Sequence, residues 1–175
     1  MERLTISLDS ESTAIVNQHL KLYHGSKADI IRRALHCLQE IEQLEQRTHM
    51  KTIRIYLDYL ANMEHIIVDI ALWKAIFNEL KNASDEFYDE VFHIGQEHQK
   101  DFFDSGRKDI KTILEFIEKT NVFKLNIDSE NSYTLILTVS EASKFLKTFF
   151  QGFFKNYPRD VEITEEYKKI RIRVI

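Results

Sequence analysis

The scarcity of glycine and proline limits, more than any other feature of the sequence, what this chain can fold into. Four glycines and one proline occur in 175 residues, whereas an average composition would contain roughly 20 such residues. Collagen-like, low-complexity and turn-dense all-β architectures need many more of them. Neither residue type occurs between Ser26 and Ile94. The sequence therefore predicts long helices, with a stiff, unbroken helical connection through this stretch.

Composition sets the class of protein. Hydrophobic residues make up 43% of the chain and charged residues 30%, with a net charge of −4, so a packed core is expected and any nucleic-acid binding needs a local basic patch. Cys37 is the only cysteine; this excludes an internal disulfide framework, and we expect a small buried side chain in a reducing compartment. No apolar run approaches 18 residues. We therefore expect a soluble, cytoplasmic protein with no membrane partner.

The distribution of aromatic residues divides the chain into two predicted domains, residues 1–46 and 47–175. One aromatic residue, Tyr23, precedes residue 50, and all 12 phenylalanines lie at or after Phe77. The second domain shows helical patterns first and a period of two later. Its predicted elements are helical segments over 50–80, 84–103 and 107–120, strands over 123–127 and 133–139, a helix over 140–157, and strands over 161–163 and 170–174. The predicted order is thus helices followed by β-β-α-β-β.

The N-terminal domain is predicted to be a strand followed by two helices. Leu4, Ile6 and Leu8 alternate with Arg3, Thr5 and Ser7, which is the pattern of a half-buried strand. A single strand needs a partner, and the next 35 residues supply only helices, so the economical partner is the same strand of a second copy. Such an antiparallel ribbon fits the DNA major groove. Two alternatives stay open: a plain dimerisation module, or a strand added to the sheet of the second domain.

Residues 3–45 resemble a ribbon-helix-helix domain of the Met repressor and Arc repressor superfamily. The resemblance rests on the strand over residues 3–8, the Gly25-Ser26 turn and the segment Ile30–Leu35. It implies a homodimer that binds double-stranded DNA, usually as a repressor. By position, Arg3, Thr5 and Ser7 would contact base edges, while Ser26 and Lys27 would hold a phosphate through backbone N–H groups and the helix dipole.

The fold class predicted from both domains is α+β: a dimeric N-terminal β-α-α ribbon-helix-helix, then a C-terminal α+β domain. The element order of the second domain is similar to that of small-molecule sensor domains of the haem-nitric-oxide-binding and vinyl-reductase-like type. The Tyr-x-Ser-x-Arg motif of the haem-binding group is absent, so haem is not implied. The sequence identifies no cofactor.

A phenylalanine-rich stripe on the predicted helix over 142–157 has two interpretations. Stripes of this kind usually pack on a sheet as core. The number of aromatic residues also suits a helix that lines an apolar ligand pocket. Trp73, Phe149, Gly152 and Phe153 are the candidate pocket residues. Gly152 is costly inside a helix, so it is expected to permit close approach by another backbone or by a ligand.

The histidines and the nucleophilic residues form no recognisable catalytic or metal-binding pattern. His93 and His98 are five residues apart, so they do not share a helix face as a zinc-binding pair would. We expect these histidines and His65 to be surface or core residues. There is no nucleophile elbow, phosphate-binding glycine loop or Cys-x-x-Cys motif. The sequence therefore predicts no catalytic residues, no metal site and no enzyme.

The predicted function is that of a sequence-specific DNA-binding transcriptional regulator, a repressor, with a C-terminal domain that senses a ligand or mediates oligomerisation. Its expected partners are double-stranded DNA, a second copy of the chain with room for higher oligomers, and a small-molecule effector. The alternative is a protein-interaction module, such as an antitoxin-like or scaffolding dimer.

Overall fold

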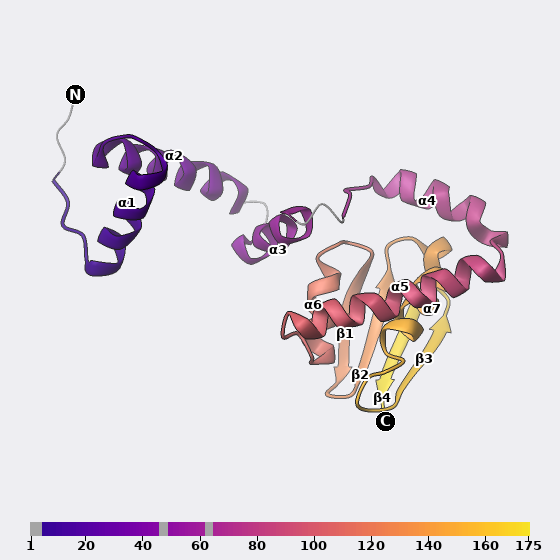
Figure 1. The fold of residues 1–175 in the computed structure, drawn as a ribbon. Coiled ribbons are helices and arrows are strands. Elements are labelled where there is room, and N and C mark those ends of the chain that lie inside the picture. The colour runs from indigo at the N-terminus through magenta and orange to yellow at the C-terminus, as the bar shows by residue number, and fades with distance from the viewer. Residues whose placement is uncertain (1–4, 46–48, 62–64) are drawn as a thin grey trace. The chain divides into compact units, whose positions relative to one another are not determined.

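A computed structural model of the chain describes residues 5–45, 49–61 and 65–175 (Figure 1). The chain divides into two compact units, Met1–Arg54 and Ile55–Ile175. The sequence placed the boundary earlier, between residues 46 and 47. The two units are described separately below.

The first unit is a helical hairpin. Helix α1 (Ser10–Leu22) starts at Asp9, whose side chain accepts a hydrogen bond of 2.7 Å from the backbone N–H of Ser12, as expected of a helix N-cap. Gly25 lies in the turn before helix α2 (Lys27–Glu45). Helix α3 (Met50–Ala61) begins in this unit and ends in the second one.

The predicted N-terminal strand is wrong, and with it the ribbon-helix-helix resemblance and the β-α-α part of the predicted fold class. Residues 5–9 form no strand, and the described chain begins with helices and has strands only near its C-terminus. Alternating side chains create a strand only where another segment pairs with its backbone, and no described segment pairs with residues 5–9. Arg3 and Leu4 lie outside the described residues.

The predicted unbroken helical connection is also wrong. Residues 65–69 are not helical, and a separate helix α4 (Ile70–Glu79) follows them. The Asp69 side chain starts this helix by accepting from the backbone N–H groups of Ala71 and Leu72, at 2.8 and 3.2 Å. An absence of glycine and proline thus does not guarantee continuity, because a cap residue defines a helix start without either.

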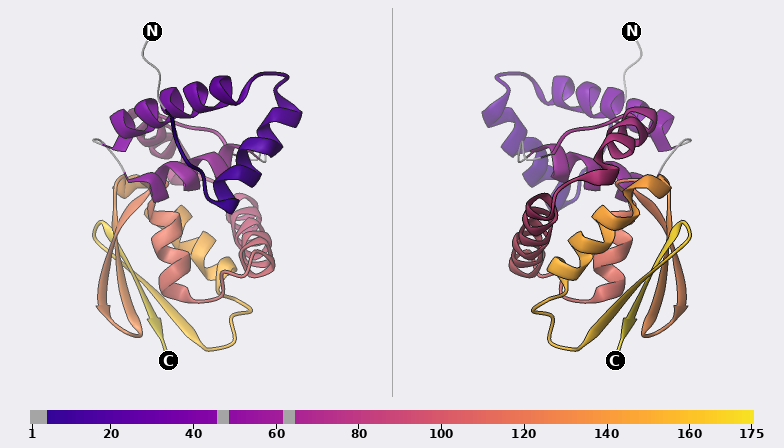
Figure 2. Two further views of the ribbon diagram at one scale, coloured as in Figure 1. Left: turned by 90° about the vertical axis from the view of Figure 1, so that its left-hand side faces the viewer. Right: turned by 90° about the vertical axis from the view of Figure 1, so that its right-hand side faces the viewer.

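The second unit is an α+β domain in which helices come first and a four-stranded antiparallel sheet closes the chain. After α4 and the short 3₁₀ helix η1 (Leu80–Asn82) come α5 (Asp85–Asp104) and α6 (Ile110–Glu118). The remaining elements are β1 (Phe123–Ser129), β2 (Ser132–Leu137), η2 (Ser140–Ala142), α7 (Ser143–Phe153), β3 (Val161–Glu166) and β4 (Lys169–Val174). The strand order is β1-β2-β4-β3. Figure 2 shows α5, α6 and α7 on the same side of the sheet.

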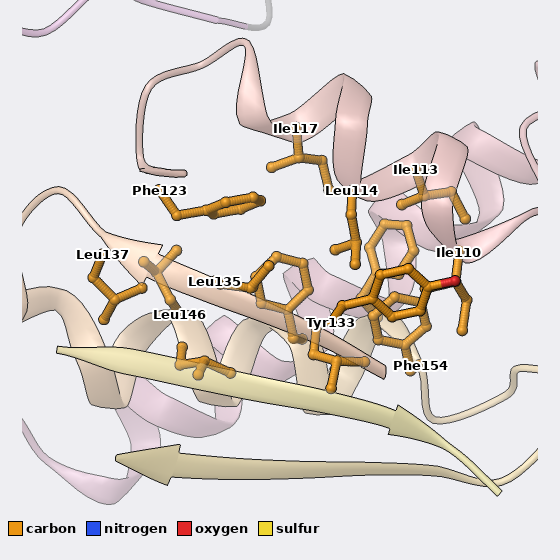
Figure 3. Close-up of a cluster of buried hydrophobic side chains, with 14 of the residues drawn as sticks. Ile110, Ile113, Leu114, Ile117, Phe123, Tyr133, Leu135, Leu137, Leu146 and Phe154 are labelled. Atoms are coloured by element: carbon orange, nitrogen blue, oxygen red, sulfur yellow. The ribbon is translucent and has the colours of Figure 1, made fainter. Parts of the chain in front are cut away.

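The core of the second unit lies between the sheet and the helices on that side. Helix α6 buries Ile110, Ile113, Leu114 and Ile117, which are spaced to fall on one face of a helix. Figure 3 shows these side chains directed toward the sheet, where Tyr133, Leu135 and Leu137 of β2 meet them. The buried part of the phenylalanine stripe belongs to this core as well, since Phe150 and Phe153 of α7 are fully buried.

Helices α5 and α7 cross at two glycines. A Cβ atom added to Gly152 would lie 1.9 Å from the carbonyl oxygen of Phe92, and one added to Gly95 would lie 2.2 Å from the carbonyl oxygen of Phe149. Real Cβ atoms essentially never approach heavy atoms closer than 3.0 Å. The glycines therefore allow the two backbones to touch, and Gly152 serves close approach by another helix rather than by a ligand.

Candidate functional site

The candidate site is an apolar pocket of about 430 Å³ in the second unit. Its walls come from the end of α3, the segment over residues 65–70, α4, α5, the end of α6, the turn before β1, residue 138 and α7. Trp73, Phe102, Phe145 and Phe149 supply aromatic surface. No Lys, Arg, Asp or Glu is among the described residues that line it. A pocket of this size and character is suited to a small, mostly apolar molecule.

Rings pack against one another around the pocket. Trp73 meets Phe77 edge to face with ring centroids 4.5 Å apart, and Phe77 meets Phe145 at 5.0 Å. On the other wall the His98 ring lies 5.6 Å from the ring of Phe149 and 6.2 Å from that of His65. Packing of this kind fixes the positions of the walls, because offset and edge-to-face contacts have preferred geometries.

His65 is the half-buried polar group of greatest chemical interest in the pocket. Its Nδ1 lies 3.2 Å from the carbonyl oxygen of Tyr59. A carbonyl oxygen can only accept, so Nδ1 carries the proton and donates. The His65 ring also meets the Tyr59 ring at 4.5 Å, which holds the imidazole in one orientation. In the neutral imidazole the other nitrogen, Nε2, is then a hydrogen-bond acceptor.

Tyr59 forms part of the wall near His65. Burial raises the pKa of the Tyr59 hydroxyl, and the positive charge of Arg107 opposes that rise. Arg107 itself lies over the ring of Phe116, 4.2 Å from its centroid, and the Tyr59 and Phe116 ring centroids are 5.0 Å apart. The phenol of Tyr59 therefore remains protonated at neutral pH and adds no charge to the pocket.

A second set of polar groups closes the pocket near the start of the sheet. Asn121 adopts a φ of 63° after α6, a left-handed conformation that asparagine tolerates. The Asn121 side-chain amide donates to the Tyr56 hydroxyl at 2.9 Å. The Thr138 hydroxyl donates to the backbone carbonyl oxygen of Asn121 at 2.6 Å. The Thr120 hydroxyl donates to the carbonyl oxygen of Ile117 at 2.7 Å. Both hydroxyls and one N–H of the Asn121 amide thus already have acceptors within the protein, so a ligand need not supply acceptors for them.

Two further concavities in this unit have charged residues in their lining. One of about 480 Å³ is lined by residues that include Lys155, Arg159 and Asp160, and one of about 630 Å³ by residues that include Glu141, Lys147 and Glu165. The first also contains Phe92, Phe154 and Tyr157, but both have charged lining residues, which the 430 Å³ pocket lacks among the residues described. The apolar pocket is therefore the stronger candidate for a ligand site.

The structure brings together only part of the predicted pocket. Trp73 and Phe149 line it, whereas Gly152 lies at the α5–α7 crossing and Phe153 lies in the core. These last two residues occupy a different part of α7 from Phe145 and Phe149. Sequence reasoning missed the role of His65 in the wall. The signal for it was a histidine beside the apolar run Ile66–Val68.

The predicted phosphate site at the start of α2 contains a carboxylate of the chain itself. The Asp29 side chain accepts from the Ser26 hydroxyl at 2.6 Å and from the Ser26 backbone N–H at 2.9 Å. It also pairs with Arg32. The Ser26 hydroxyl and backbone N–H, followed by Arg32, lower the pKa of Asp29 to about 2. A phosphate bound there would compete with this anion, while the Lys27 side chain is exposed nearby.

The other predicted DNA contacts lack the strand that was to present them. Thr5 and Ser7 are exposed in a segment without regular structure, and Arg3 lies outside the described residues. Cys37, predicted to be buried, is exposed. The prediction failed because α1 is the main packing partner of α2 among the described residues, and much of the α2 surface is uncovered, Leu35 and Leu38 included.

Comparison with known proteins adds no family. No family model matches the chain, and no curated protein is significantly similar to it. The similarity of element order to haem-nitric-oxide-binding and vinyl-reductase-like domains therefore gains no support. Among the described residues, no helix is long and apolar enough to cross a bilayer. The same residues contain no group of three or more histidine, cysteine or acidic side chains placed to hold a metal ion.

Proposed function

We propose that this protein is a DNA-binding transcriptional regulator whose second unit senses a small, mostly apolar molecule. The observation that carries the ligand-sensing part of the proposal is the 430 Å³ pocket with aromatic walls and no charged lining residue among those described. An apolar ligand that enters such a pocket loses contact with water over most of its surface, which is the main source of its binding free energy. A role in the cytoplasm is part of this proposal, in keeping with the single cysteine.

The distribution of charge in the first unit supports DNA as the partner. Residues 19–36 hold four cations, Lys21, Lys27, Arg32 and Arg33, against one carboxylate. All four cations are exposed, in a chain whose net charge is −4. A local excess of positive charge around the turn of the hairpin is suited to phosphate contacts, which supply much of the affinity of proteins for DNA. The proposal leaves open how bases would be recognised, because the ribbon is not part of it.

The first unit also supports a homodimer. Val16 and Ile30 are its buried apolar side chains among the described residues, whereas Leu35 and Leu38 of α2 are 56% and 50% exposed. A unit of this size with so small a core is marginal alone, and a second copy would cover these leucines. A different protein as partner is the competing function. Sedimentation of the full chain distinguishes the two, because a monomer at micromolar concentration would contradict the homodimer.

Selection from a random pool of duplex DNA with the full-length protein tests the proposed function. We expect a recurring sequence, an affinity that falls steeply with salt, and roughly tenfold weaker binding after Arg33→Glu, since the change removes one phosphate contact and adds a repulsion. Lys100→Glu, an equal charge change at an exposed position of α5, is the matched control. Failure to enrich any duplex, or equal effects of the two substitutions, would reject DNA binding.

A further inference from the structure

The pocket offers one hydrogen-bond acceptor in an apolar setting, and this acceptor bears on which ligand it takes. His65 Nδ1 donates to the carbonyl oxygen of Tyr59, so Nε2 of the neutral ring keeps its lone pair. No hydrogen bond joins this Nε2 to any residue that the structure describes. An acceptor that loses water without gaining a donor costs free energy, so a ligand that donates to it is favoured over one that does not.

The charge of the pocket argues for a neutral ligand. A carboxylate taken from water into a low-dielectric site needs a cation or several donors to compensate for its lost hydration. The described lining contains no lysine or arginine, and the nearby Arg107 is engaged with the ring of Phe116. The hydroxyl donors of Thr120 and Thr138 and one N–H of the Asn121 amide are already used within the protein. The surroundings therefore favour a donor that carries no charge.

The shape of the walls argues for a ring. Tyr59, Trp73, Phe145 and Phe149, together with the imidazoles of His65 and His98, present faces and edges to the pocket. Aromatic groups gain from edge-to-face and offset contacts in addition to the area that they bury. A flexible alkyl chain of equal area lacks those contacts and loses more conformational entropy on binding.

We infer that the pocket binds a neutral, ring-containing compound of the phenol type, whose hydroxyl donates to Nε2 of His65 while its ring packs against Trp73 and Phe149. The inference rests on the proposed function, because it names the ligand class of the same pocket. His65 thus determines which member of a set of apolar rings binds best.

Trp73 makes the inference directly measurable. It is the only tryptophan of the chain, and it lines the pocket, so its fluorescence reports on occupancy. The experiment titrates the full-length protein with para-tert-butylphenol, with its methyl ether, which has no donor, and with para-tert-butylbenzoate, which carries a charge. Excitation at the red edge of tryptophan absorption avoids absorption by the phenol.

We expect the phenol to bind roughly tenfold more tightly than the ether, the difference that one hydrogen bond to an otherwise unpaired buried group makes. His65→Phe keeps a ring and removes Nε2, so it should bring the two affinities together by weakening the phenol alone. His93→Phe is the matched control, because His93 is exposed on α5, where it bonds to Gln96, and is not part of the pocket wall; it should leave the preference intact.

Each other outcome overturns a defined part of the reasoning. Equal affinities of phenol and ether in the unsubstituted protein would reject the role of His65 but leave an apolar pocket in place. If the benzoate bound most tightly, the pocket would have to hold a charged imidazolium, and the inference of a neutral ligand would be wrong. Binding of none of the three compounds, with unchanged fluorescence and thermal stability, would reject the sensor pocket of the proposed function together with the inference.

Discussion

Replacement of Gly152 by alanine tests the closest helix–helix contact in the molecule. The added methyl group would lie 1.9 Å from the carbonyl oxygen of Phe92 and 2.8 Å from its carbonyl carbon. An ordinary contact starts at 3.4 Å, so α5 and α7 must separate locally by up to about 1.5 Å. The obstacle is backbone, which cannot move aside as the end of a flexible side chain can.

The expected destabilisation follows from two opposing contributions. Overpacking of a well-filled interior costs about 1–3 kcal/mol, and more where nothing can yield. Alanine is better than glycine in a helix interior by about 1 kcal/mol, but Gly152 is next to the last residue of α7, so little of that gain applies. We expect Gly152→Ala to lower the free energy of unfolding by about 2–3 kcal/mol.

The assay is urea unfolding followed by Trp73 fluorescence, which reports on the second unit. Gly106→Ala is the matched control: Gly106 has a φ of +83° and no atom within 4 Å of an added Cβ, so it tests strained backbone without a clash and should cost about 1 kcal/mol. A Gly152→Ala protein as stable as the parent, or more stable, would refute the contact between the two backbones.

A double substitution sharpens the test. Gly95→Ala would meet the carbonyl oxygen of Phe149 and the backbone nitrogen of Phe153, at 2.2 and 2.8 Å, so it strains the same crossing. Once the first methyl group has separated the helices, the second should cost less than it does alone. The double variant should therefore be more stable than the sum of the single effects predicts. Strict additivity would mean that the two glycines act at independent places.

Two further predictions concern the core and the start of α2. Leu114→Ala should lower the free energy of unfolding by about 2–5 kcal/mol, because the side chain is fully buried and leaves a cavity. Leu57→Ala, at a site 63% exposed, should change the free energy of unfolding by less than about 0.5 kcal/mol in the same urea assay. Equal effects of the two substitutions would contradict the assigned core. The hydrogen bonds from Ser26 hold the pKa of Asp29 at about 2 against an ordinary value of 3.8, so the carboxylate stabilises the start of α2 above pH 3.8, and this contribution is lost as the pH falls toward 2. Far-ultraviolet circular dichroism should show a loss of helicity in that window that is absent from Asp29→Asn; identical curves for both proteins would exclude the cap as its cause.

The sequence predicted those parts of the fold in which one pattern decides the outcome. The alternation over 123–127 and 133–139 marks β1 and β2, and the helical spacing of Ile110, Ile113 and Leu114 marks α6. The predicted strand is wrong over residues 5–9, because strand formation depends on a pairing partner as well as on alternation. The prediction of an unbroken helical connection is wrong at residues 65–69, because Asp69 caps a new helix there although no glycine or proline interrupts the sequence.

The candidate site was harder to predict than the fold, because it depends on which side chains from distant segments meet. A stripe of phenylalanines cannot by itself show where core ends and pocket begins; in α7 the division falls between Phe149, at the pocket, and Phe150 and Phe153, which are fully buried. The acceptor at His65 depends on a hydrogen bond to a backbone carbonyl six residues earlier. No pattern of residue types encodes such a contact.

The contact of backbones at Gly95 and Gly152 limits how far the α5–α7 side of the pocket can close. Phe149 and His98 lie on helices that cannot approach each other further, so these helices cannot close around a ligand narrower than the pocket. Closure around a narrower ligand falls to other lining residues, among them Tyr59, His65 and Trp73, which come soon after Ile55, the first residue of the second unit. A conformational change caused by such a ligand would therefore occur in the part of the second unit that is nearest in sequence to the first unit.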